Sequence, residues 1–67
     1  MCLSTAYKNR TDPDCIAMRN VKEISCRAGE VLLTDLMGHT LSVEGTLEKA
    51  DLVNGFVVIR SSCENQA

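Results

Sequence analysis

The chain has 67 residues, of which 45% are hydrophobic, and its formal net charge is −2. This length allows one small domain with a marginal core, and the composition excludes a disordered chain. The basic residues are scattered singly along the sequence. A nucleic-acid partner requires a basic patch for its phosphates, so the charge pattern argues against one.

The first half of the sequence alternates in short segments that predict strands. Residues 3–8 have a side-chain period of two, which is typical of a strand. Turn formers fill residues 9–14 and include the only proline. Two further runs, residues 15–18 and residues 21–27, are predicted as a second and a third strand, and residues 28–30 end the third.

The middle of the chain contains its most apolar segment and its cleanest alternation. Residues 31–37 read VLLTDLM, and Gly38 with His39 then makes a turn. Apolar residues and Gly45 occupy one face of residues 41–47, and polar residues occupy the other. A glycine inside such a run predicts a bulge or a sharp bend between two sides of a barrel.

The last third of the chain predicts a hairpin. Residues 46–53 have some helical propensity, but this segment is shorter than a stable helix, so a strand or bend is preferred. Asn54-Gly55 is a strong hairpin signal, and residues 56–59 form the return strand. Five or six short strands in this arrangement indicate an all-β fold, either a small barrel or a sandwich. We expect one domain over residues 1–60 and a polar tail over residues 61–67.

The four cysteines and the absence of long apolar stretches indicate the cellular compartment of the protein. No segment approaches the roughly 18 apolar residues of a membrane span, and no signal peptide is visible. We therefore expect a cytoplasmic protein with reduced thiols. The cysteines contain no C-x-x-C pair, which argues against a structural zinc site. Cys15 and Cys26 are predicted to pack in the core, and Cys63 to be an exposed thiol.

The sequence offers little that resembles an active site, so we expect no enzyme. Its carboxylates form no pair suited to acid–base catalysis, and no glycine-rich phosphate loop is present. His39, the single histidine, is either an exposed turn residue or a metal ligand.

Cys2 carries the most distinctive chemistry. Removal of Met1 would leave an α-amine and a thiol on the same residue, and both lose a proton readily when a metal is offered. The amine and thiolate then close a five-membered chelate ring, to which the backbone amide of Leu3 adds a nitrogen. Nitrogen and sulfur donors in one plane suit Ni(II) or Cu(II). A cysteine at this position by chance is the alternative.

The order and spacing of several segments resemble those of the CooT family, small nickel-binding accessory proteins of carbon monoxide dehydrogenase maturation. The likeness covers nearly the whole chain. It rests on the start Met1-Cys2, residues 31–38 (VLLTDLMG), 43–47 (VEGTL) and 49–52 (KADL), the Asn54-Gly55 turn and residues 56–59 (FVVI).

The resemblance implies a small SH3-like or Sm-like barrel of antiparallel strands that forms a homodimer and binds nickel through its N-terminal cysteine. Carried over to this sequence, it assigns the metal to Cys2 alone, with two copies of Cys2 meeting at a two-fold axis. A role in storing or handing over Ni(II) follows, with carbon monoxide dehydrogenase or its maturation factors as partners. His39 departs from the family, which tends to carry acidic residues there. A small-barrel RNA-binding module and a metal-free protein-interaction module remain as alternatives.

Overall fold

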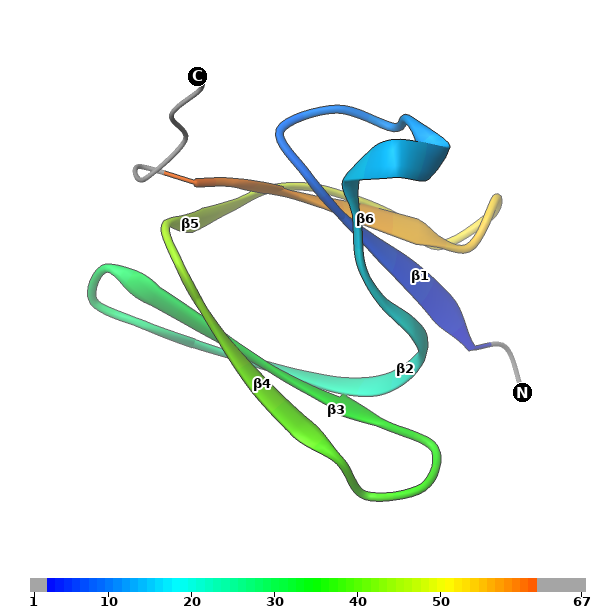
Figure 1. Cartoon of the computed structure of the whole chain (residues 1–67), viewed down its shortest axis with the longest axis horizontal. Coiled ribbons are helices and arrows are strands. Elements are labelled where there is room, and N and C mark those ends of the chain that lie inside the picture. Colours follow the sequence, from blue (N-terminus) through cyan, green and yellow to red (C-terminus); the bar gives the residue numbers. More distant parts are fainter. Residues whose placement is uncertain (1–2, 62–67) are drawn as a thin grey trace.

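The computed structural model describes residues 3–61, and six strands of this part form a single coiled sheet (Figure 1). The elements are β1 (Ser4–Lys8), the 3-10 helix η1 (Pro13–Cys15), β2 (Ile16–Arg27), β3 (Glu30–Asp35), β4 (Thr40–Glu44), β5 (Thr46–Asp51) and β6 (Phe56–Arg60). The described part of the chain contains no helix with the length and hydropathy that a membrane crossing requires.

The strand order β4-β3-β2-β1-β6-β5 makes the fold barrel-like, as predicted from the sequence. It differs from the prediction in two respects. The seam between the edge strands β4 and β5 is not closed, and one strand pair is parallel rather than antiparallel. That pair joins β1 to β6, with Thr5 opposite Phe56 and Lys8 opposite Ile59. It links the N-terminal and C-terminal strands of the domain across the whole length of the sequence.

Small aliphatic side chains fill the concave side of the sheet. Alternate residues of β3 point inward, as Val31 and Leu33 show, and so do Val57 and Ile59 of β6, as the period of two predicts. The buried cluster consists of Ala6, Val21, Val31, Leu33, Val43, Val57 and Ile59. It contains no aromatic residue, so tight packing of branched side chains supplies its dispersion energy.

The two runs predicted as separate strands merge into the single twelve-residue strand β2. The chain turns at Asn20, which has a φ of 55°, and the pairing register with β3 shifts between Val21 and Glu23. Strict alternation would place Val21 and Ile24 on opposite faces. The irregularity instead lets both contact the core.

The prediction that Cys15 and Cys26 pack in the core is wrong for Cys26, which is exposed on β2. Cys15 ends η1 rather than lying in a strand, and it is half-buried. The Asp12 side chain starts η1 by accepting the Asp14 N–H at 3.2 Å, and Pro13 supplies the fixed φ of the first helical position. Cys63 lies outside the described residues.

Gly45 makes the bend between β4 and β5 that the sequence predicts. Its N–H donates to the Gly29 carbonyl at 3.0 Å, and its φ is 140°. A Cβ atom at this position would collide with the carbonyl oxygen of Arg60. Residues 46–51 then form a strand and not a helix, because pairing with β6 supplies the backbone hydrogen bonds.

A positive φ alone costs a residue with a Cβ atom roughly 1–3 kcal/mol. Gly45→Ala should destabilise the domain by more than this, because the collision with the Arg60 carbonyl adds to the backbone strain. Gly29→Ala is the matched control, since Gly29 also has a positive φ but no atom lies within 4 Å of its added Cβ. Urea unfolding measures both free energies. Equal losses of unfolding free energy in the two variants would contradict the close approach of the Arg60 carbonyl to Gly45.

Candidate metal centre at the N-terminal end of the sheet

The start of β1 and two turns lie at one end of the molecule (Figure 1). We call this region the N-terminal end: the start of β1, the β3–β4 turn (residues 36–39) and the β5–β6 turn (residues 52–55). The Thr5 N–H donates to the Gly55 carbonyl at 3.0 Å, and the Leu36 N–H donates to the Asn20 carbonyl at 2.9 Å. The β5–β6 turn is therefore joined to β1, and the β3–β4 turn is joined to β2.

Register across the sheet fixes the spacing within this end. Ser4 of β1 lies opposite Val21 of β2, and Val21 lies opposite Asp35 of β3. Neighbouring strands are about 4.8 Å apart, so Ser4 and Asp35 are separated by roughly 10 Å. Cys2, the predicted metal ligand, lies outside the described residues. It precedes Ser4 by two positions.

Asp51 organises the β5–β6 turn. Its carboxylate accepts the backbone N–H of Val53 at 3.1 Å, that of Asn54 at 2.9 Å, and the Asn54 side-chain amide at 2.9 Å. The Asp51 carbonyl also accepts the Gly55 N–H at 2.9 Å. The hydrogen bonds from Asn54 hold the pKa of Asp51 below its usual range.

Asp35 plays the same part in the β3–β4 turn. Its Oδ1 accepts the backbone N–H of Met37 and that of His39, both at 2.9 Å. Its Oδ2 lies 3.2 Å from Nδ1 of the His39 ring. The backbone hydrogen bond from His39 is the main cause that lowers the pKa of Asp35.

Exposed apolar side chains lie on the two turns of the N-terminal end. The two turns contribute Leu36 (54% exposed), Met37 (78%), Leu52 (77%) and Val53 (93%). A shallow groove of about 240 Å³ runs beneath Leu52, between Ser4 of β1 and Val21 and Ile24 of β2. Hydrophobic side chains clustered at one end of a small protein are typical of a protein-interaction surface.

No group of three or more potential metal ligands occurs among residues 3–61. Cys15, at the end of η1, and Cys26, in β2, are free thiols. The described residues thus provide no cluster of three side-chain ligands for a metal ion. His39 is the predicted ligand candidate that the structure places at the N-terminal end.

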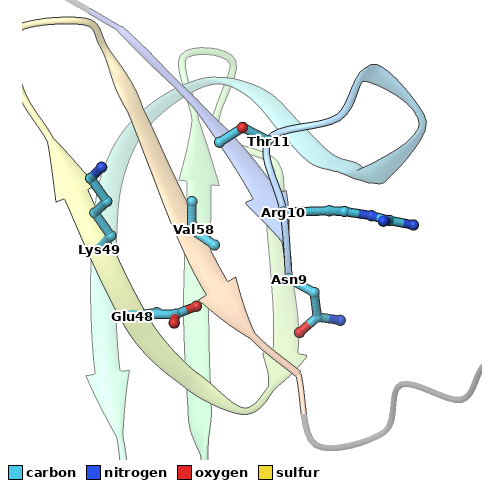
Figure 2. A pocket seen from close by; sticks show the side chains of 6 residues that line it. All are labelled: Asn9, Arg10, Thr11, Glu48, Lys49 and Val58. Atoms are coloured by element: carbon cyan, nitrogen blue, oxygen red, sulfur yellow. The ribbon is translucent and has the colours of Figure 1, made fainter.

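A larger hollow of about 490 Å³ lies on the outer face of β6, above Val58 (Figure 2). Two of its polar side chains, Asn9 and Glu48, form hydrogen bonds within the protein. The Asn9 amide oxygen accepts the Ser61 N–H at 2.9 Å, and Glu48 accepts a hydrogen bond from Arg60 at 2.8 Å. The Arg10 side chain points away from the other lining residues in Figure 2. The lining residues include neither cysteine nor histidine, so this hollow does not extend the candidate metal centre.

The family model for the CO dehydrogenase accessory protein CooT matches residues 1–60. This chain belongs to the CooT family. The crystal structure of the protein assigned as CooT in Carboxydothermus hydrogenoformans superposes with a TM-score of 0.77 at 15% sequence identity, covering 91% of this chain and 98% of that chain. At this identity the likeness concerns the fold. No curated protein matches the chain.

The two turn aspartates make stability depend on pH in a predictable direction. Because the folded pKa of each is lowered, their contribution is fully present above the unfolded pKa and is lost as the pH falls through the folded one. The wild type should therefore lose more free energy of unfolding between pH 6 and pH 3 than Asp35→Asn/Asp51→Asn. Both amides retain an oxygen acceptor for the turn N–H groups. Urea unfolding at each pH measures the free energies. Equal losses in the wild type and the double variant would contradict the lowered pKa values of the two aspartates.

Proposed function

We propose that this protein binds Ni(II) through the amine and thiolate of Cys2, and that two copies share one ion across a two-fold axis. In this role it stores nickel or hands it over during assembly of CO dehydrogenase, whose accessory protein gives the family its description. The family match carries the proposal, because it covers residues 1–60 and so includes Cys2.

The chemistry of the donors supports a shared site. One N-terminal cysteine provides an amine nitrogen and a thiolate sulfur, which are two of the four donors that a square-planar ion requires. A second copy related by a two-fold axis provides the other two. The described residues add no cluster of ligands that would complete the set within one chain.

The apolar character of the N-terminal end supports a dimer that forms there. Val53 is 93% exposed and Leu52 is 77% exposed, on the turn that is hydrogen-bonded to β1. A second copy that brought its N-terminus to the same ion would cover these side chains and remove their apolar surface from water.

The open seam of the sheet favours a second candidate function, which is recruitment of a partner by strand addition without a metal. β4 pairs regularly with β3 along its whole length, whereas β5 is interrupted by an irregularity between Leu47 and Lys49. An uninterrupted edge strand is the better template for an added strand. Stable co-purification with one partner, together with no metal binding, would favour this function.

Cys2→Ser should abolish the thiolate-to-nickel charge-transfer band of the tag-free protein and lower its nickel affinity. The loss should exceed the 10–100-fold that removal of an outer-shell partner costs, because a ligand itself is removed. Cys26→Ser is the control, since it removes an exposed thiol of β2 and should leave the titration unchanged. Nickel binding of undiminished strength in Cys2→Ser would overturn the proposal.

Val53→Glu should weaken the nickel-loaded dimer by about tenfold or more, because an unpaired carboxylate covered by a second copy costs more than the roughly 1–3 kcal/mol of an unpaired neutral group. Ala28→Glu introduces the same charge at the exposed β2–β3 turn, at the opposite end of the molecule, and should leave the dimer unchanged (Figure 1). Sedimentation analysis with and without Ni(II) gives both dissociation constants. Equal behaviour of the two variants would place the interface elsewhere.

A further inference from the structure

The Asp35–His39 pair has the geometry of an oriented metal-binding imidazole. Nδ1 of His39 lies 3.2 Å from Oδ2 of Asp35, and the His39 side chain is 77% exposed. The Asp35 side chain is only 18% exposed, so most of its surface is covered by the protein. The chain has no other histidine.

The partner of Nδ1 determines where the lone pair of the neutral ring lies. An ionised carboxylate only accepts hydrogen bonds, so Nδ1 must carry the proton that it donates to Asp35. A carboxyl group with the ordinary pKa of an aspartate is ionised near neutral pH. The lone pair of His39 is consequently on Nε2, the nitrogen that does not contact Asp35. Neutral imidazole binds metals through this lone pair.

The backbone around the pair is held by several hydrogen bonds. The Asp35 N–H donates to the His39 carbonyl at 2.9 Å, and the Gly38 N–H donates to the Asp35 carbonyl at 3.0 Å. Asp35 Oδ1 accepts two further backbone N–H groups of the same turn, those of Met37 and His39. A ligand on a turn held in this way loses little conformational freedom when it binds a metal.

Carboxylate support of this kind is typical of metal-ligating histidines, where it fixes the tautomer and raises the basicity of the ligating nitrogen. A single imidazole leaves the other coordination positions of the ion to water. Such a site exchanges its ion readily, which suits capture and delivery rather than storage. Asp35 also lies roughly 10 Å from Ser4, so the turn is close to the strand that follows Cys2.

We propose that the Asp35–His39 pair presents Nε2 of His39 as an exchangeable ligand for a divalent transition-metal ion that imidazole favours, Ni(II) or Cu(II), and that it delivers this ion to Cys2. The metal contact at His39 is independent of Cys2. The delivery step rests on the proposed function.

The first experiment tests the contact alone, in the Cys2→Ser protein. Ni(II) is added while the ring resonances of His39 and the backbone amides are followed by NMR. We expect the ring signals and the amides of residues 36–39 to broaden first. His39→Gln should abolish this local effect, and Asp35→Asn should weaken binding by about 10–100-fold. The asparagine retains an acceptor for Met37 and His39, and the amide spectrum reports whether the turn persists.

Two results would overturn the contact. One is the absence of selective broadening at residues 36–39. The other is an unchanged affinity in Asp35→Asn with the turn intact, which would make His39 an ordinary exposed imidazole with no carboxylate support.

The second experiment tests delivery in the protein that retains Cys2. The rise of the thiolate-to-nickel band after rapid mixing should be several-fold slower in His39→Gln, with the same final amplitude. An unchanged rate would overturn delivery while leaving the contact at His39 in place. Absence of the band in the parent protein would overturn the proposed function and delivery together, and the first experiment would still decide the contact.

Discussion

The parallel pairing of β1 with β6 is the interaction on which the rest of the structure depends. Without it the sheet separates into one part made of β1 to β4 and another made of β5 and β6, because β4 and β5 do not pair. Neither part would enclose the core, since Val57 and Ile59 come from β6 and Val31 and Leu33 from β3. The pairing closes a loop of about fifty residues, so its loop-closure entropy cost exceeds that of any other strand pair in the sheet.

The same pairing determines what lies at the N-terminal end. Since β1 and β6 run in parallel, the start of β1 adjoins the start of β6 and the turn before it. The antiparallel register of β2 and β3 then brings Asp35 into the same row as Ser4. The apolar turn residues and the single histidine therefore lie at the same end of the molecule as the start of β1, although they are far apart in the sequence (Figure 1).

The two turns at this end are stabilised by the same kind of hydrogen bonding. An aspartate at the end of each preceding strand accepts the backbone N–H groups of the residues that reverse the chain. Because Asp35 and Asp51 satisfy these groups, the apolar side chains at the tips of the turns are not needed to hold the backbone. Exposed Leu and Val residues at such positions contribute little to the core of an isolated chain, and their apolar surface favours contact with another protein.

Local patterns in the sequence determined which segments become strands and where the chain turns. Alternation placed Val43 on the apolar face of its strand, Asn54-Gly55 marked the last turn, and Gly45 marked the bend, because these signals act over a few residues. The sequence also singled out Cys2 and His39 as candidate ligands from their chemistry. Only the tertiary structure decided that β1 pairs with β6, that the irregularity in β2 directs both Val21 and Ile24 inward, and that Cys26 is exposed. It also decided that Asp35 orients His39, since a hydrogen bond to a ring nitrogen depends on the geometry of the folded turn and not on the spacing of two residues. These outcomes depend on pairing between distant strands and on register, which no local period specifies.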